Sequence, residues 1–180
     1  MRKISETRVY EGAWLRVNNL VYQHGSHTFT WESIERTRQA TILVIIAKLI
    51  PSERYILIRQ FRPGYGNHVM GLPAGLCYCR DFAAEALREL KEETGYTGSI
   101  LSVSPELAFN PAISNEKLYI VRADVDENNS VNLNPVQQLE PEEDITVFPV
   151  PQNELTSFLA LHKSQGTAIS AALWYLSLVA

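Results

Sequence analysis

The segment LRELKEETGY, residues 87–96, crowds glutamates into a stretch that is otherwise typical of a stable helix. With Glu85 one turn earlier, acidic residues recur at positions i, i+4 and i+7 or i+8, and they therefore share one helix face. Like charges at this spacing destabilise a helix by roughly 0.2–0.5 kcal/mol per pair. A solvated acidic face is the simplest interpretation, and a binding site for a divalent cation is the alternative.

The residues around this segment favour the cation site. Asp81 is a good N-cap and Gly95 a good stop signal, so a helix is expected between them. The preceding GLPAGL bend brings backbone carbonyls next to the acidic face. Glu89 and Glu93 are close enough across one turn to hold a single hard cation, with Glu92 beside them for a second. Carboxylate and carbonyl oxygens suit Mg²⁺ or Mn²⁺.

The remaining sequence predicts strands and two further helices in a chain of 180 residues, a length that suits one domain. Helices are expected at 152–163 and 167–179. Strand-like apolar segments bounded by turn residues lie at 8–23, 28–39, 40–49, 53–63, 68–76, 99–110, 116–125 and 145–151. Because strands and helices do not alternate as βαβ units, the predicted fold class is α+β with a mixed sheet between helices.

Charge and hydropathy exclude several classes of partner. A formal net charge of −4 argues against a basic nucleic-acid-binding surface. The longest apolar run, residues 40–50, is interrupted by Lys48 and is too short to cross a bilayer. The first twelve residues lack the apolar core of a signal peptide. Cys77 and Cys79 suggest no disulfide framework, so a reducing cytoplasm is the predicted location, and without a second such pair they make a poor zinc site.

The segment PAGLCYCRDFAAEALRELKEETGY, residues 73–96, resembles the signature of the Nudix hydrolases. That signature is a glycine, five residues, a glutamate, seven residues, and then Arg-Glu-aliphatic-x-Glu-Glu-x-Gly-aliphatic. Its second half is matched by Arg88, Glu89, Leu90, Glu92, Glu93 and Gly95, with Tyr96 in the last position. The resemblance implies a Nudix-like α/β/α sandwich with a mixed β-sheet. It also implies the roles of the site residues: metal binding by Glu89, Glu92, Glu93 and the Ala74 carbonyl, and orientation of the carboxylates by Arg88.

The first half of the signature departs from the pattern. Twelve residues separate Gly75 from Arg88, one fewer than in the family, and the family's first glutamate falls on Arg80. In the family this glutamate mostly supports the site, so an altered rate or metal affinity is expected. Asp81 is a candidate replacement.

Nearly the whole chain resembles one subgroup, the ADP-ribose (ADP-sugar) pyrophosphatases. The matching residues are Trp31-Glu32-Ser33, Arg36, Gln60-Phe61-Arg62-Pro63, Pro73-Ala74-Gly75-Leu76 and Pro111. The resemblance implies an N-terminal β region at 1–40, which contacts adenine and is exchanged across a homodimer, and a Nudix domain at 41–180. It further implies substrate contacts: Trp14 and Trp31 on the faces of the adenine, Glu32 on its edge, and Arg36 and Arg62 near the diphosphate. Strand packing is the alternative role of the tryptophans.

In similar enzymes the base that activates water is a glutamate on the loop before the strand that corresponds to 145–151. Alignment on that strand puts Glu143 in this position, with Glu140 and Glu142 as alternatives and a merely solvated acidic loop as another. Glu116 is expected to face the substrate or a metal-bound water. A catalytic role is thus expected of Glu143, together with Glu92 and Arg88.

The implied reaction is Mg²⁺-dependent hydrolysis of ADP-ribose or a related ADP-sugar to AMP and a sugar phosphate, with Mn²⁺ as another suitable ion. Alternatives are hydrolysis of another nucleoside diphosphate derivative, such as GDP-mannose or a dinucleotide cofactor, and a non-catalytic ADP-ribose-binding domain. A purely structural domain is a third.

Overall fold

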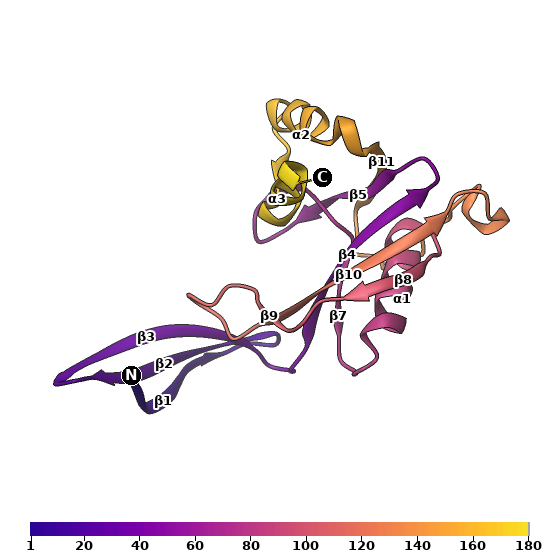
Figure 1. Ribbon diagram of the computed structural model, residues 1–180. Coiled ribbons are helices and arrows are strands. Elements are labelled where there is room, and N and C mark those ends of the chain that lie inside the picture. The colour runs from indigo at the N-terminus through magenta and orange to yellow at the C-terminus, as the bar shows by residue number, and fades with distance from the viewer. Residues whose placement is uncertain (180) are drawn as a thin grey trace. The chain divides into compact units, whose positions relative to one another are not determined.

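The structure is a computed structural model that describes residues 1–179 (Figure 1). The chain forms two compact units. The first contains residues 1–42, 76–80 and 105–119, and the second contains residues 43–75, 81–104 and 120 onward.

An antiparallel three-stranded sheet makes up most of the first unit. Its strands β1 (Arg2–Glu11), β2 (Leu15–His24) and β3 (His27–Arg36) pair in the order β1-β2-β3. The turn between β2 and β3 contains Gly25 at φ 62°, a left-handed conformation that glycine adopts without strain. The predicted strand over 28–39 and the turn before it are thus confirmed. The segment predicted over 8–23 instead divides at residues 12–14 into β1, which begins earlier at Arg2, and β2.

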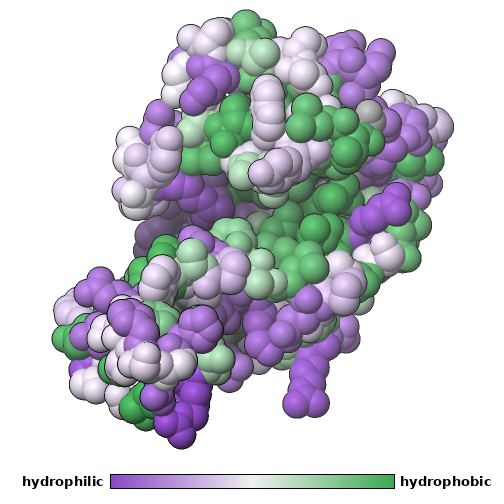
Figure 2. Space-filling view, turned by 60° about the vertical axis from the view of Figure 1, so that its left-hand side comes forward, coloured by the Kyte–Doolittle hydropathy of each residue, from purple (hydrophilic) through white to green (hydrophobic). Residues whose placement is uncertain are grey.

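These three strands bury very few side chains. Within them only Asn18 is buried, and several large apolar side chains are exposed: Ile4, Val9, Tyr10, Leu15 and Trp31. The space-filling view likewise shows hydrophobic side chains that reach the surface among hydrophilic ones (Figure 2). The exposed apolar residues of β1–β3 indicate a surface that a ligand or a second chain could cover.

The other nine strands form one mixed sheet. Its central order is β12-β6-β5-β4-β10-β8, and β11, β7 and β9 pair with β5, β4 and β10 respectively. The strands are β4 (Thr41–Ile50), β5 (Arg54–Arg62), β6 (Asn67–Gly71), β7 (Ala74–Cys77), β8 (Ser99–Val103), β9 (Leu107–Ala108), β10 (Lys117–Asp126), β11 (Ile145–Pro151) and β12 (Ala168–Ile169). Because β12 is parallel to β6 while β11 and β6 are antiparallel to β5, the predicted mixed sheet is confirmed.

Three α-helices accompany the sheet: α1 (Phe82–Thr94), α2 (Leu155–Ser164) and α3 (Ala171–Val179). Two short 3₁₀ helices lie at Ser130–Asn132 and Gln152–Glu154. In Figure 1, α1 lies beside β8, and α2 lies beside α3. Within residues 1–179 we find no helix with the length and apolar character needed to cross a membrane.

The prediction of one helix over 167–179 is wrong at its start. Ala168 and Ile169 instead form β12, which pairs with β6, and Thr167 and Ala168 are buried. The helix begins only after Ser170, whose side chain accepts a hydrogen bond from the backbone N–H of Leu173 at 3.3 Å. A two-residue strand leaves too short a pattern to recognise, because tertiary pairing rather than local propensity forms it.

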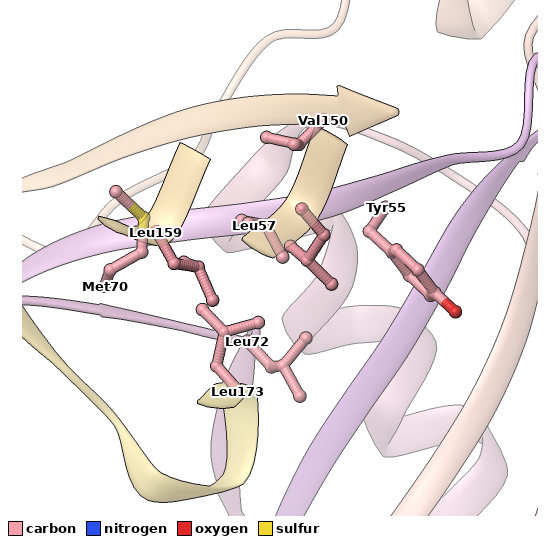
Figure 3. Packing of buried hydrophobic residues seen from close by; sticks show 8 residues of the cluster. Tyr55, Leu57, Met70, Leu72, Val150, Leu159 and Leu173 are labelled. Carbon is pink, nitrogen blue, oxygen red and sulfur yellow. The ribbon is translucent and has the colours of Figure 1, made fainter. Parts of the chain in front are cut away.

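One hydrophobic core of the second unit lies between the sheet and the two C-terminal helices (Figure 3). Its buried members come from β5, β6, β11, α2 and α3 and from the residue after β6: Tyr55, Leu57, Met70, Leu72, Val150, Leu155, Leu159 and Leu173. Strands β5 and β6 thus rest on a packed core on the side of α2 and α3, which makes this part of the sheet a rigid support.

Candidate active site

Helix α1 begins and ends as its sequence predicts. The Asp81 side chain accepts a hydrogen bond from the Ala84 N–H at 3.1 Å, and Gly95 adopts φ 79° at the C-terminus. Ala86 and Leu90 are fully buried on the apolar face. Because Ala86 and Leu90 are buried on one face, the rotation of the helix about its axis is fixed, and with it the direction in which the glutamates point.

Glu93 is the most unusual of these glutamates, since it is only 3% exposed. Its Oε2 accepts a hydrogen bond from the Ala74 N–H at 2.9 Å, which joins α1 to the first residue of β7. Burial raises the pKa of the Glu93 carboxyl to about 8, although the hydrogen bond from Ala74 acts in the opposite direction. A nearby cation would offset this loss of hydration.

Glu89 reaches the same short stretch of β7. A Cβ atom on Gly75 would lie 2.0 Å from the carboxyl carbon of Glu89, so glycine is the residue that leaves room for this side chain. Burial raises the pKa of Glu89, and the charge of Arg88 opposes that shift. Two carboxylates therefore converge on the Ala74–Gly75 segment from one helix face.

Arg88 balances much of the acidic charge on α1. Its guanidinium donates hydrogen bonds to Glu85 at 2.6 Å, to Glu89 at 2.5 Å and to Glu92. These charge-assisted bonds offset the repulsion that the sequence implies. The predicted pairing of Arg88 with the carboxylates is thus present, and it extends to Glu85, which sequence reasoning treated only as part of the acidic face.

No group of three or more His, Cys, Asp or Glu side chains is arranged to hold a metal ion in the part of the chain that the structure describes. The donor set nevertheless fits Mg²⁺ or Mn²⁺, because the carboxylates of Glu89 and Glu93 lie against adjacent residues of β7, Gly75 and Ala74, and both have a raised pKa. The residues that would hold the ion are Glu89, Glu93 and the Ala74 carbonyl, with Glu92 beside them.

The loop that carries Glu143 is tied to the C-terminal end of α1. The Gln137 side chain donates hydrogen bonds to the carbonyls of Glu93, at 2.6 Å, and Ile145, at 3.2 Å. The Gln138 N–H donates to the Glu92 carbonyl at 2.8 Å. Sequence reasoning missed Gln137 and Gln138, because two glutamines in a polar loop carry no signal of a specific partner.

Glu143 and Arg62 lie near enough to Glu93 to act on its charge. The charge of Glu143 raises the pKa of Glu93, and the charge of Arg62 at the end of β5 lowers it. The Glu143 side chain also accepts a hydrogen bond from the Glu140 N–H at 2.9 Å, which holds the carboxylate in place. The choice of Glu143 over Glu140 and Glu142 as the base stays a prediction.

The first unit contains the other predicted substrate residues. Arg36 and Glu116 form an ion pair at 2.8 Å that joins β3 to the segment before β10. They line a cavity of about 420 Å³ whose charged residues also include Arg16, Glu35 and Lys117. Sequence reasoning did not identify these three, because their charges are spread over separate strands.

The two tryptophans and Glu32 are on the surface of the same unit. Trp14 is 79% and Trp31 51% exposed, so neither ring fills a core. The Trp31 indole N–H donates a hydrogen bond to the Ala112 carbonyl at 2.6 Å, which fixes the ring on β3. Glu32, the next residue on β3, is also exposed.

Comparison with known proteins agrees with this architecture. Residues 37–169 match the model of the NUDIX domain. The chain is 32% identical to an ADP-ribose pyrophosphatase of Saccharomyces cerevisiae, over 94% of this chain and 77% of the relative. It is 29% identical to an ADP-sugar pyrophosphatase of Mus musculus, over 94% of this chain and 83% of that one.

A solved structure described as an ADP compounds hydrolase has the same fold. It superimposes with a TM-score of 0.67 at 19% sequence identity, and the match covers 88% of this chain and 82% of the other. The NUDIX model covers more than half of this chain, and the match to the yeast relative covers nearly all of it. The chain therefore belongs to the Nudix family, and it is a Nudix hydrolase.

Proposed function

We propose that the protein hydrolyses the diphosphate bond of ADP-ribose or a related ADP-sugar, giving AMP and a sugar phosphate. The observation that carries this proposal is the convergence of Glu89 and Glu93 on the Ala74–Gly75 segment, next to Glu143 and Arg62. The names of the yeast and mouse relatives support the choice of substrate class.

The carboxylates would have different roles in metal binding. Glu89, Glu93 and the Ala74 carbonyl would hold Mg²⁺ or Mn²⁺, and Glu92 would assist a further ion. A bound divalent ion would supply charge neutralisation at the diphosphate and a lower pKa for the attacking water. Arg88 would hold the carboxylates in orientation through its hydrogen bonds.

Glu143 would accept the proton of the attacking water, a contribution of roughly 10²–10⁴ in rate. Its hydrogen bond with Glu140 and the bonds of Gln137 to the end of α1 would keep the carboxylate beside the reacting diphosphate. Arg62 would bind a phosphate oxygen, because a guanidinium fork matches that geometry.

The exposed residues of the first unit suit the nucleoside part of the substrate. Trp14 and Trp31 would stack on adenine, which offers two π-faces, and Glu32 would accept a hydrogen bond from its edge. Arg36 would act on the diphosphate, and Glu116, its ion-pair partner, on the substrate.

We also propose that the protein is a homodimer whose residues 1–40 are exchanged between subunits, with residues 41–180 as the hydrolase domain. Support comes from the family resemblance and from the exposed apolar residues of β1–β3. A cytoplasmic location remains the expectation from the sequence.

Two alternatives keep the same site. Hydrolysis of GDP-mannose or a dinucleotide cofactor would use the same carboxylates, and the aromatic side chains would contact a different nucleotide. A non-catalytic ADP-ribose-binding domain is favoured by one observation, the presence of Arg80 where the family has its first glutamate.

Product analysis decides among these possibilities. The protein would be incubated with ADP-ribose, GDP-mannose and a dinucleotide cofactor, with Mg²⁺ and with EDTA, and the products separated by chromatography. Release of AMP from ADP-ribose only with Mg²⁺, and its loss in Glu89→Gln, is the expected result. Binding of ADP-ribose without AMP release would overturn the catalytic proposal.

A further inference from the structure

The end of β7 and the loop that follows it contain the only two cysteines of the sequence, Cys77 and Cys79. Both are thiols, and their sulfur atoms lie 3.4 Å apart. The Cys77 Sγ also lies 3.3 Å from the Cys79 carbonyl oxygen, so the chain folds back on itself at this point. The proposed hydrolysis uses neither thiol.

The two thiols differ in their access to solvent. Cys77 ends β7 and is 1% exposed, whereas Cys79 is exposed. Between them, the Tyr78 ring is covered by the Arg38 guanidinium, 4.1 Å from the ring centroid. This contact anchors the residue between the two cysteines.

We propose that Cys77 and Cys79 are a site of reversible oxidation, at which a hydroperoxide converts the two thiols into a disulfide within one chain. An exposed thiol beside a second, sheltered thiol is the arrangement of a peroxide-sensitive pair, in which the first is oxidised to a sulfenic acid and the second then forms the disulfide with it.

The step balances as a two-electron oxidation. The Cys79 sulfur attacks one oxygen of the hydroperoxide, whose O–O bond breaks, and a sulfenic acid forms while water or an alcohol leaves. The Cys77 sulfur then attacks the sulfenic sulfur, the S–S bond forms, and the hydroxyl departs as water with the Cys77 proton. Two thiols are oxidised to one disulfide, and the peroxide receives the two electrons. A dithiol reductant reverses the change by exchange.

The geometry makes this disulfide labile. The sulfur atoms must approach from 3.4 Å to about 2.05 Å. The closed loop contains a single intervening residue, so it removes little entropy from the unfolded chain. Strained or exposed disulfides are the easily reduced ones. The pair therefore suits a reversible modification better than a permanent crosslink.

The position of the pair gives it an effect on catalysis, and this part rests on the proposed function. Cys77 is three residues after Ala74 in β7, and Cys79 is two residues before Asp81, the N-cap of α1. Any contraction of the loop is transmitted along the chain to the strand and the helix that would hold the metal. A displacement of about 1 Å costs roughly hundredfold in rate, so tenfold to hundredfold lower kcat/KM is expected on oxidation.

Mass spectrometry tests the modification on the full-length protein. After hydrogen peroxide, the monomer should lose two hydrogen atoms and both sites of N-ethylmaleimide labelling, and dithiothreitol should restore them. Because Cys77 and Cys79 are the only cysteines, this mass loss identifies the bond without ambiguity. Addition of oxygen to Cys79 while Cys77 still reacts with maleimide, or a chain-to-chain disulfide on a non-reducing gel, would overturn the proposal.

Activity tests the consequence, with Cys79→Ser as the matched variant because position 79 is exposed. Wild-type hydrolysis of ADP-ribose should fall on oxidation and recover on reduction, while Cys79→Ser should keep one rate throughout. Equal rates of the oxidised and reduced wild type would overturn the catalytic effect. If neither form hydrolyses ADP-ribose, the proposed function fails, and the mass measurement still decides the modification by itself.

Discussion

Replacement of Glu93 by Gln should stabilise the metal-free protein at neutral pH. Burial raises the pKa of Glu93 from its ordinary value of 4.5 to about 8. The folded protein therefore binds this proton more tightly than the unfolded chain does. The contribution of Glu93 to stability is therefore most favourable below pH 4.5, decreases as pH rises, and levels off above pH 8. The Gln side chain is neutral at every pH and can still accept the hydrogen bond from the Ala74 N–H.

The magnitude follows from the two pKa values. Each unit of pH between them costs the wild type about 1.4 kcal/mol, so at pH 7 the cost is about 3 kcal/mol. For a chain of this size, 1 kcal/mol corresponds to about 2–4 °C, which gives a gain of about 6–12 °C for Glu93→Gln. At pH 4.5 and below, the variant and the wild type should melt at nearly the same temperature.

Thermal melts with EDTA between pH 4.5 and pH 8 measure this effect. Glu92→Gln is the matched control, because Glu92 is on the same helix but 34% of its side chain is exposed and it pairs with Arg88. The control should show no gain that grows with pH. Added Mg²⁺ should raise the melting temperature of the wild type but not of Glu93→Gln, which should also lose turnover. A melting difference that stays constant from pH 4.5 to pH 8 would refute the burial argument.

Four further predictions concern the site and the assembly. Gly75→Ala should reduce Mg²⁺ affinity and turnover at least about tenfold, because the added Cβ would overlap the Glu89 carboxylate. The melting temperature should change little, since that side chain is flexible. Gly71→Ala is the control: its Cβ would have its nearest contact at 3.7 Å, so Mg²⁺ affinity in a metal titration should not change. Gln137→Ala should lower kcat more than it raises KM, since its amide links the end of α1 to the start of β11, and unchanged steady-state kinetics would contradict that role. Trp31→Ala should weaken ADP-ribose binding by roughly 1–3 kcal/mol, measured by calorimetry. The melting temperature should stay level, because the ring is half exposed. Unchanged affinity with a lower melting temperature would show that Trp31 serves in packing instead. Light scattering should show a homodimer held by residues 1–40, and a stable, fully active monomer would count against that assembly.

Much of the fold could be predicted because local signals agreed with tertiary structure. The features of helix α1 can be predicted directly from the sequence: the N-cap Asp81, the buried residues Ala86 and Leu90, and Gly95 in the left-handed conformation. Strand β4 is similarly clear, since it is rich in β-branched residues and its positions alternate between buried and half-buried. The two-residue strand β12 could not be predicted, because its pairing depends on a partner far along the chain. The segment predicted as one strand over 99–110 contains β8 and the two-residue β9, with a break between them.

The site was predictable only in part, for a related reason. Spacing on one helix places Glu89 and Glu93 on a common face, and this is visible in a single sequence. The degree to which each carboxylate is buried depends on β7, and the tie through Gln137 depends on a loop more than forty residues away. Hydrogen bonds of this range leave no periodic signal, so the sequence indicates the chemistry of the site better than its supports.

The structure also explains how one acidic helix face divides into unlike environments. Arg88 is shared among Glu85, Glu89 and Glu92, so these carboxylates have a counter-charge within the helix. Glu93 differs from them, because it is buried and accepts its hydrogen bond from the neutral backbone N–H of Ala74 rather than from a guanidinium. Added positive charge therefore stabilises the fold most at Glu93, since that carboxyl has lost its hydration without gaining an ion pair. A cation shared by Glu89 and Glu93 would supply that charge while leaving the bonds of Arg88 to Glu85 and Glu92 intact. The main unfavourable effect at Glu93 is thus its burial, and a divalent ion shared with Glu89 would offset it.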